Sequence, residues 1–351
     1  MKDIRDYSLL AHNTFGIDAK CRRFLEYSSV EEAQQIVAAL TDADKPLLIL
    51  GGGSNLLLTG DYAGTVLHSS IMGIEVLGNG ELAAAEHDDA LLNPEFVFLR
   101  CGSGEVFDDV VAYAVEHGYH GAENLSIIPG EVGASAVQNI GAYGVEAKDI
   151  IYKVEAVEIA TGRVVVFDNQ DCHYCYRQSK FKHEWKDKYL VTHVVYRLSR
   201  SFVPDLDYGN IRASLAAKHI ENPTAQQLRD VIIEIRNAKL PDPKVQGNAG
   251  SFFMNPIVEK AKFEELAAQY PSMPHYTIDG EHEKIPAGWM IDQCGWKGKS
   301  LGRAGVHDKQ ALVLVNRGGA TGGEIVNLCE TIRKDVKQKF GIDIHPEVNV
   351  K

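Results

Sequence analysis

Apolar residues recur every three to four positions in several parts of the chain, a period typical of helices with one buried face. The segments that show it are residues 30–40, 105–117, 224–237 and 324–340. Ser29 and Glu32 stand three apart at the start of the first segment, in the pattern of a capping box. Lys337 and Lys339 lie at the end of the last one, where cations suit the helix dipole.

Short apolar runs between these segments predict strands. They cover residues 46–50, 152–159, 189–198 and 311–315. Because helices and strands alternate along the chain, the expected class is α+β or α/β. Residues 78–95 are small, acidic and turn-rich, and are expected to be a surface insertion between strands. Proline-containing stretches at 221–223 and 240–243 suggest joints, and we place the main domain boundary at the second.

Composition narrows the class of protein. The chain has 351 residues, enough for two or three domains, and 45% of them are apolar. It contains no apolar run near the roughly 20 residues of a membrane span, and its first residues lack the apolar region of a signal peptide. We therefore expect a cytoplasmic protein. A formal net charge of -12 disfavours a nucleic-acid partner.

The six cysteines are scattered, which argues against a disulfide framework in a chain with no secretion signal. Cys172 and Cys175 form the one close pair. A zinc site would need a second ligand pair, and a redox dithiol normally opens a helix. Two partly buried thiols are the simpler interpretation, and we expect no metal.

Residues 51–55 form a glycine turn that directly follows the strand predicted over 46–50. A dinucleotide-binding fingerprint would need a third glycine where Leu56 stands, and it would need a helix to follow. The segment is therefore interpreted either as a backbone nest between two strands, which can hold phosphate through successive N–H groups, or as an ordinary tight turn, and by itself it does not favour one over the other.

A second glycine-rich stretch, residues 128–144, is long, poor in charge and made mostly of small residues. Small side chains let a backbone approach a ligand closely, and Gln138 and Asn139 add donors and acceptors. Two such loops suggest a pyrophosphate held from two sides.

Three further segments carry polar residues in small or apolar settings. They are residues 175–179, 247–256 and 344–348. In the second, Gly250 and Ser251 precede two phenylalanines, which suggests a hydroxyl exposed beside aromatic packing. The segment lacks the G-x-S-x-G pattern of a nucleophile elbow, so it does not indicate a serine hydrolase.

Taken together, these motifs make the chain resemble the UDP-N-acetylenolpyruvoylglucosamine reductase family, in its type I branch, over nearly the whole length. The segments that carry the resemblance are 13–16, 51–55, 129–144, 176–177, 239–243, 250–256, 291–293 and 346–348. The resemblance implies an α+β, FAD-binding fold of the vanillyl-alcohol-oxidase (PCMH) type, with two flavin-binding domains and a C-terminal substrate-binding domain. We expect the flavin-binding parts over 1–70 and 71–240, the substrate-binding domain over 241–340, and a terminal segment, 341–351, that returns to the active site.

The resemblance also implies site residues. Arg177, Ser251 and Glu347 are the implied catalytic set. The implied substrate contacts are Tyr176, Tyr208, Lys239, Asn255 and Gln293. The expected FAD contacts in the two glycine-rich loops are Gly51, Gly52, Gly53, Ser54, Asn55, Pro129, Gly130, Gly133, Ala134, Ser135, Gln138, Asn139, Gly141, Ala142, Tyr143 and Gly144. Three positions depart from the common family pattern: Cys175 stands for Gly, Gln178 for Asp, and Met254 for Lys, which removes one cation expected near the phosphates.

The activity implied is NADPH-dependent reduction of UDP-N-acetylglucosamine enolpyruvate through FAD, in peptidoglycan precursor synthesis. Ser251 would donate a proton and Arg177 would bind the substrate carboxylate. Glu347 would either polarise a water or stabilise the enolate as a protonated acid, and the sequence leaves both roles open. We expect a monomer whose partner is this small molecule.

Three other functions compete with this interpretation. A flavin oxidase on the same scaffold often tethers its flavin through a histidine. A non-enzymatic flavin or nucleotide-sugar sensor would lack the Arg177, Ser251 and Glu347 set. A Rossmann dehydrogenase is disfavoured by the missing third glycine.

Overall fold

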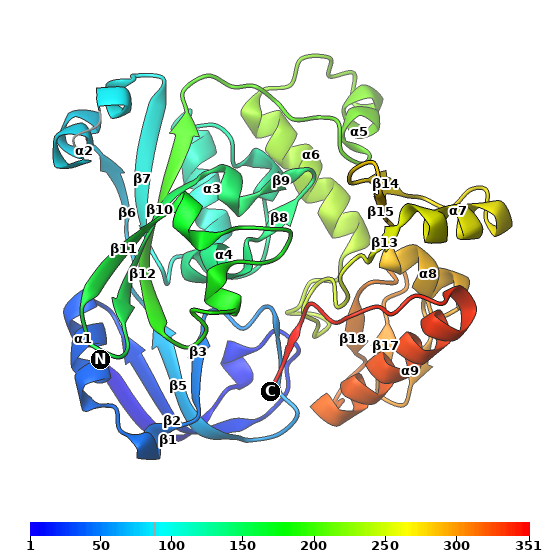
Figure 1. The fold of residues 1–351 in the computed structure, drawn as a ribbon, viewed down its shortest axis with the longest axis horizontal. Helices are drawn as coiled ribbons and strands as arrows, with labels where there is room; N and C mark the ends of the chain where they lie inside the picture. The colour runs from blue at the N-terminus through cyan, green and yellow to red at the C-terminus, as the bar shows by residue number, and fades with distance from the viewer. Residues whose placement is uncertain (87–88) are drawn as a thin grey trace. The chain divides into compact units, whose positions relative to one another are not determined.

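The computed structural model describes residues 1–86 and 89–351, which divide into two compact units (Figure 1). The first unit comprises Met1–Tyr7, Cys21–Gly52 and Ala63–Arg236. The second comprises Ser8–Lys20, Gly53–Tyr62 and Asn237–Lys351. Two short N-terminal segments thus group with the C-terminal part of the chain.

A four-stranded sheet with the order β1-β2-β5-β3 begins the first unit. Its strands are β1 (Lys2–Ser8), β2 (Lys20–Tyr27), β3 (Leu47–Leu50) and β5 (Tyr62–Ser69). β3 and β5 are parallel, with Leu48 opposite Val66. Helix α1 (Val30–Ala39) buries Ala33, Ile36 and Val37 in the core of this part of the unit.

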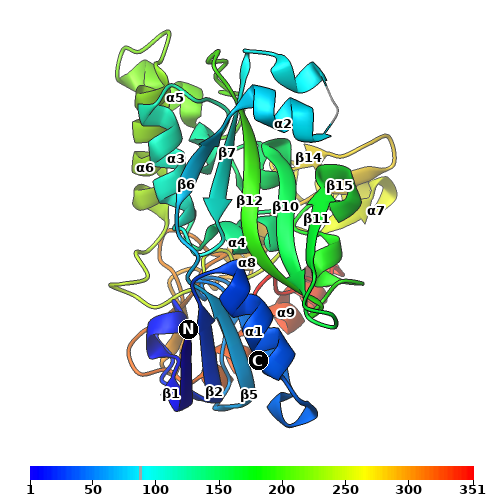
Figure 2. The ribbon, with the colours of Figure 1, turned by 90° about the vertical axis from the view of Figure 1, so that its left-hand side faces the viewer.

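A five-stranded sheet with the order β11-β10-β12-β7-β6 forms the larger part of the first unit, and Figure 2 shows its strands side by side. They are β6 (Ile74–Leu77), β7 (Phe96–Gly102), β10 (Ile151–Glu158), β11 (Val164–Asp168) and β12 (Tyr189–Ser199). All neighbouring strands are antiparallel. Helices α3 (Phe107–Glu116) and α4 (Val132–Gln138) share one hydrophobic core with this sheet.

Smaller elements complete the first unit. They are α2 (Asn79–Glu86), the hairpin of β8 (Gly141–Ala142) and β9 (Val145–Glu146), α5 (Ile211–Ala217) and α6 (Ala225–Lys239). Helices α5 and α6 pack on each other through Ile211, Leu215 and Ile232. α6 continues past Arg236 into the second unit.

The second unit contains three short sheets, ordered β13-β15-β14, β16-β17-β18 and β19-β4. Their strands are β4 (Leu56–Leu57), β13 (Ile257–Glu259), β14 (Tyr276–Thr277), β15 (His282–Lys284), β16 (Ser300–Leu301), β17 (Ala304–Val306), β18 (Leu314–Asn316) and β19 (Asn349–Val350). Its helices are α7 (Lys260–Gln269), α8 (Ala287–Gln293) and α9 (Gly322–Phe340). The parallel pairing of β19 with β4 binds the end of the chain to the segment that follows Gly53.

The motif at residues 13–16 is a buried turn of the second unit. The Asn13 side chain donates to the carbonyls of Leu9 (2.8 Å) and Ile17 (2.9 Å) and accepts from the Ile17 N–H (2.9 Å). The Thr14 carbonyl then accepts from the N–H of Asn248, at the same 2.9 Å. The motif therefore positions the segment that leads to Ser251.

Most predicted elements are confirmed. The helices over 30–40, 105–117, 224–237 and 324–340 are α1, α3, α6 and α9, and the strands over 46–50, 152–159 and 189–198 are β3, β10 and β12. The Ser29 hydroxyl accepts from the Glu32 N–H as a cap, but the Glu32 carboxylate bonds to Ser28 and the chain's amino group instead of closing the box.

Three expectations need correction. The strand predicted over 311–315 is shorter and later, at 314–316, because residues 310–313 form a turn with Val313 N–H bonded to the Gln310 carbonyl. The glycine-rich stretch 128–144 contains helix α4. The 78–95 insertion does lie between strands β6 and β7, but it holds α2 rather than only turns; residues 87–88 of it fall outside the described part.

Among the helices of the described residues, none is long and apolar enough to cross a membrane.

We predict that Asn13→Ala destabilises the protein by about 3 kcal/mol, because it leaves two carbonyls and one N–H of a buried turn without their partner. Urea unfolding followed by tryptophan fluorescence measures the change. Asn327→Ala is the control, since Asn327 is exposed on α9 of the same unit and alanine favours helix. Equal midpoints for both variants would contradict the role of the turn.

Candidate active site

The two glycine-rich stretches meet within the first unit. A β-carbon built on Gly52 would lie 3.6 Å from the Gly130 α-carbon, and one built on Gly51 would lie 3.4 Å from the Ala134 β-carbon. Gly130 has φ +122°, a conformation that side chains strongly disfavour. The turn after β3 therefore lies against the start of α4, with no side chain at either glycine to separate the two backbones.

The first stretch joins two strands, as predicted. It runs from β3 to β4 without a helix, which agrees with a nest rather than a Rossmann turn. A β-carbon on Gly53 would lie 1.9 Å from the His12 carbonyl oxygen, so glycine is required there by packing within the second unit. Asn55 in turn donates from its side chain to the Glu347 carbonyl at 3.3 Å.

Several residues of α4 face the core rather than a ligand. Ser135 is fully buried, and its hydroxyl bonds to the Val132 carbonyl and the Tyr196 hydroxyl, each at 2.7 Å. A β-carbon on Gly133 would lie 2.9 Å from the Ser103 β-carbon. These residues are therefore able to contact a cofactor only through their backbone.

Asn139 ends α4 in the left-handed conformation, with φ +48° and no exposed surface. Its side-chain amide donates to the Cys175 carbonyl at 2.8 Å, and its side-chain oxygen accepts from the Lys148 N–H at 2.9 Å. Asn139 thus ties the glycine-rich stretch to the segment that carries Arg177.

Arg177 lies at the tip of a tight hairpin. Cys175 and Gln178 exchange two backbone hydrogen bonds, each 3.0 Å long, and Arg177 between them has φ +57°. A left-handed arginine is uncommon and is favoured where the fold needs a side chain aimed in one direction. Lys182 secures the turn by donating to the Arg177 carbonyl at 2.9 Å.

The Arg177 guanidinium bonds to the glycine-rich stretch of the same unit. Its Nη1 lies 3.4 Å from the Asn139 carbonyl oxygen, and its Nη2 lies 2.5 Å from the Gly141 carbonyl oxygen. Glu146 adds a carboxylate oxygen 3.5 Å from Nη1, and the Tyr176 ring lies 5.1 Å from the guanidinium carbon. Arg177 is therefore oriented by the same loop that is expected to hold FAD.

Ser251 is exposed at the start of an ordered segment of the second unit. Gly250 before it has φ +67°, and its N–H donates to the Asn248 side chain at 2.9 Å. Phe252 and Phe253 after it are each 1% exposed. The sequence expectation of a hydroxyl presented beside buried aromatic rings is confirmed.

Glu347 lies next to this segment. Its N–H donates to the Phe252 carbonyl at 2.8 Å, and Met254 N–H donates to the His345 carbonyl at 3.0 Å. These antiparallel contacts fix residues 345–347 beside residues 252–254. The second unit therefore brings together Ser251 and Glu347, which the sequence separates by most of the C-terminal half.

The expected substrate contacts divide between the two units. Tyr208 in the first unit is 37% exposed, and its ring meets the Tyr143 ring edge-on at 6.3 Å. In the second unit, Lys239 is exposed at the end of α6 and Gln293 at the end of α8. The Asn255 side-chain oxygen accepts from the Ala287 N–H at 2.9 Å, which anchors the start of α8.

The three residues that depart from the family pattern lie in different surroundings. Cys175 is exposed beside Arg177, and the Gln178 side-chain oxygen lies 2.8 Å from His183 Nε2. Met254 is half-buried and shares the backbone pairing with His345.

Sequence reasoning missed the polar residues that support the site. Glu131, Glu146 and Arg236 were not singled out, although each lies near the glycine-rich stretch: Arg236 donates to the Ile127 carbonyl at 3.5 Å. Burial lowers the pKa of Arg236. Arg236 is spaced three residues from Lys239, but nothing in the helical pattern distinguishes it from a surface cation.

The cysteine pair does not behave as a matched dithiol. Cys172 is buried and Cys175 is exposed, so the expectation of two partly buried thiols is wrong for both. Burial raises the pKa of Cys172 to about 11. Within the described ranges, no group of three or more His, Cys, Asp or Glu side chains is placed to hold a metal ion.

Comparison with known proteins decides the family. A family model described as UDP-N-acetylenolpyruvoylglucosamine reductase, C-terminal domain, matches residues 242–351, and one described as FAD binding domain matches 22–168. A curated Bacteroides fragilis protein named UDP-N-acetylenolpyruvoylglucosamine reductase is 56% identical over 343 residues, covering 98% of each chain. The chain belongs to the UDP-N-acetylenolpyruvoylglucosamine reductase family. A Porphyromonas gingivalis protein of the same name is 47% identical over 99% of this chain and 98% of its own.

Solved structures agree on the fold. UDP-N-acetylenolpyruvylglucosamine reductase from Thermus caldophilus aligns with a TM-score of 0.66 at 19% identity, covering 99% of this chain and 98% of that one. The 6-hydroxy-D-nicotine oxidase of Arthrobacter nicotinovorans aligns with a TM-score of 0.52 at 14% identity, covering 97% and 86%. The expected α+β FAD-binding fold of the vanillyl-alcohol-oxidase type is confirmed.

The residues present fit a flavin diphosphate. Gly51 and Gly52 carry no side chains of their own and lie against the start of α4, so their backbone can approach a ligand closely. The Glu131 carboxylate also lies at this point, 3.2 Å from the β-carbon position of Gly51.

We predict that Cys175 is the fast-reacting thiol of the native protein, since Cys172 is buried and its thiolate is scarce at neutral pH. Titration with a disulfide reagent at about pH 7.5 should lose its fast phase in Cys175→Ser and keep it in Cys172→Ser. Loss of both thiols together on mild oxidation would instead support a redox pair.

Proposed function

We propose that this chain reduces UDP-N-acetylglucosamine enolpyruvate to UDP-N-acetylmuramate with NADPH, in the synthesis of peptidoglycan precursors. The observation that carries the proposal is the 56% identity to a reductase of this name over 98% of both chains. The matched FAD binding domain and the paired glycine-rich loops supply the place for the cofactor. When bound, FAD would supply the hydride-transfer chemistry that links NADPH to the enol ether.

Hydride transfer alone does not complete the reduction, so the protein must also supply a proton. Addition of a hydride to one carbon of the enol ether leaves an enolate on the other, and one proton must reach that carbon. Ser251 is our proposed donor, since its hydroxyl is exposed after a left-handed glycine and its backbone is fixed by the buried Phe252. The resulting alkoxide regains a proton from solvent through neighbouring groups.

Arg177 is our proposed partner of the substrate carboxylate, where enolate charge also accumulates. A guanidinium has five N–H donors in one plane, so bonds to the Gly141 and Asn139 carbonyls orient it while other donors remain for an anion. Glu347 is the acidic residue whose backbone pairs with Phe252, next to Ser251. We propose that Glu347 holds a water or the enolate oxygen.

Binding of the nucleotide part is assigned to exposed side chains. We propose that Tyr208, which contacts Tyr143, packs on the bound sugar nucleotide and that Lys239 pairs with its diphosphate. Asn255 and Gln293 complete the proposed contacts, with Tyr176 beneath Arg177. Because Met254 provides no charge where many relatives have lysine, Lys239 would carry a larger share of the diphosphate binding.

We further propose that the enzyme acts as a monomer in the cytoplasm, without a nucleic-acid partner. Its phosphorylated co-substrates do not cross membranes unaided, and its formal net charge of -12 opposes nucleic acid.

We predict that the purified protein carries FAD and oxidises NADPH only slowly until the enolpyruvyl sugar nucleotide is added. The flavin absorbance spectrum and the loss of NADPH absorbance measure both points. Acid precipitation should release the yellow colour, since the proposed contacts are non-covalent. A colourless protein that takes up no FAD, or rapid NADPH oxidation by oxygen alone, would contradict the proposed activity.

We predict that Ser251→Ala slows the second half-reaction by roughly 10²–10⁴-fold and leaves reduction by NADPH nearly intact, because only the sugar substrate needs a proton from Ser251. Stopped-flow absorbance separates the two half-reactions. Ser251→Cys should recover part of the rate, since a thiol also delivers a proton. A wild-type second step in Ser251→Ala would transfer the donor role to Glu347 or a water that it binds.

A further inference from the structure

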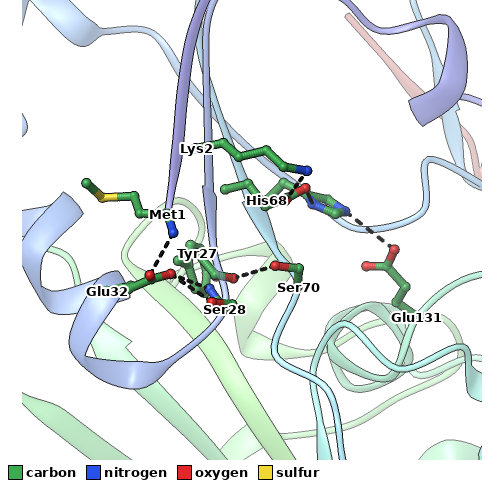
Figure 3. Close-up of polar contacts among 9 residues, drawn as sticks. Met1, Lys2, Tyr27, Ser28, Glu32, His68, Ser70 and Glu131 are labelled. Carbon is green, nitrogen blue, oxygen red and sulfur yellow. Dashed lines mark hydrogen bonds and ion pairs between the residues drawn. The ribbon is translucent and has the colours of Figure 1, made fainter.

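A row of four ionisable side chains, basic and acidic in alternation, runs through the first unit to the turn at Gly51 and Gly52. Lys2 Nζ on β1 lies 2.6 Å from a Glu26 carboxylate oxygen on β2, and the other Glu26 oxygen lies 3.1 Å from His68 Nδ1 on β5. His68 Nε2 lies 3.5 Å from a Glu131 oxygen at the N-cap of α4. Figure 3 shows the His68 ring directed at the Glu131 carboxylate.

His68 is the centre of this charged row. Its side chain is 9% exposed, and those of Glu26 and Glu131 are 13% and 15% exposed. The Phe24 ring stacks on the His68 ring, with 5.7 Å between the ring centroids. Buried carboxylates are costly unless a cation is within reach, and His68 is the group that contacts both. Protonated, it offers one N–H to each carboxylate.

The far end of the row reaches the glycine turn. The two Glu131 carboxylate oxygens lie 3.2 Å and 3.5 Å from the β-carbon positions of Gly51 and Gly52. A negative charge at this distance from a backbone that holds diphosphate weakens binding of the diphosphate unless it is neutralised.

We propose that His68 is a positioning residue for the flavin diphosphate: as an imidazolium, it holds Glu131 against Gly51 and Gly52 and cancels its charge. The proposal rests on the FAD site described above. It makes the affinity for FAD dependent on one proton, held on a buried histidine rather than on the ligand or on a loop side chain.

Charge counting gives the direction of the pH dependence. With His68 protonated, Lys2 and His68 contribute +2 and Glu26 and Glu131 contribute −2, so the charged row sums to zero. Loss of the His68 proton leaves a net −1 beside the turn. FAD should therefore bind most tightly at low pH and more weakly as pH rises through the pKa of His68.

The pKa directions agree with this count. Burial alone would lower the pKa of His68, but the carboxylates of Glu131 and Glu26 outweigh it and raise the pKa above its ordinary 6.5. Burial acts to raise the pKa of Glu26, and the Lys2 ammonium and His68 bring it below its ordinary value. The phenols of Tyr7 on β1 and Tyr27 on β2 also face the row, and burial raises the pKa of Tyr27, so it stays neutral. His68 is thus the member of the row whose raised pKa decides the net charge beside Glu131.

The test is the dissociation constant of FAD between about pH 6 and 9, measured on the holoenzyme by ultrafiltration and flavin fluorescence. Wild type should lose affinity by about tenfold over this range, the effect of one partly screened charge. Glu131→Gln should bind FAD at least as tightly as wild type at the acidic end and show no such loss. His68→Gln should bind about tenfold more weakly at the acidic end, with a flat profile.

The double variant separates charge from structure. If His68 acts by neutralising Glu131, His68→Gln with Glu131→Gln should regain the affinity of Glu131→Gln, whereas affinity that stays at the level of His68→Gln overturns the proposal. His193→Gln is the matched control: His193 is a 12% exposed histidine 3.4 Å from Glu155, on β12, and its loss should leave the wild-type pH profile unchanged.

The wild-type measurement distinguishes failure of this inference from failure of the proposed function, and a second variant covers the case in which His68→Gln does not fold. If His68→Gln does not fold, the pH profile of Glu131→Gln decides alone, and a wild-type slope in that variant overturns the proposal. If the wild-type protein binds no FAD at any pH, the proposed function fails. If it binds FAD with an affinity that does not fall as pH rises over this range, only the role of His68 fails.

Discussion

Burial of helix α4 against the five-stranded sheet is the constraint on which the first unit depends. Val132 and Ala136 enter the sheet core, and the Ser135 hydroxyl bonds to Tyr196 at 2.7 Å. With one side of the helix fixed in this way, Glu131 and Ala134 at its start lie next to Gly51, and Gly130 and Glu131 lie next to Gly52. A larger residue at Gly133 would meet Ser103, so glycine at this position allows the helix to pack closely.

The same short helix organises the charges around it. The Arg177 guanidinium donates to the carbonyls of the helix's C-cap Asn139 and of Gly141 in β8, and the N-cap carboxylate, that of Glu131, contacts His68. The Glu146 carboxylate, 3.5 Å from Arg177 Nη1, adds a negative partner to these two neutral carbonyls. A histidine placed between two carboxylates gains its charge from them. One element thus supports a permanent cation and a titratable one.

The second unit holds the backbone of Ser251, and with it the exposed hydroxyl, in a fixed position. Two buried phenylalanines follow Ser251, and residues 345–347 near the C-terminus pair with the same segment through the Glu347 N–H. The buried turn around Asn13 supports Asn248, which in turn caps the Gly250 N–H. Ser251 is therefore held by backbone bonds from segments at both ends of the sequence.

The sequence by itself determined the longer elements, the two glycine loops and the family motifs, because periodic burial and glycine-rich turns are local patterns. It did not reveal α4, since Gly and Ser are poor helix formers and the helix owes its stability to tertiary packing rather than to propensity. Nor did it reveal the contact of Glu131 with His68, or the hold of Asn139 on Cys175. The two residues of each pair are distant in sequence. Such polar groups interact strongly only when the fold brings them close together and removes them from water.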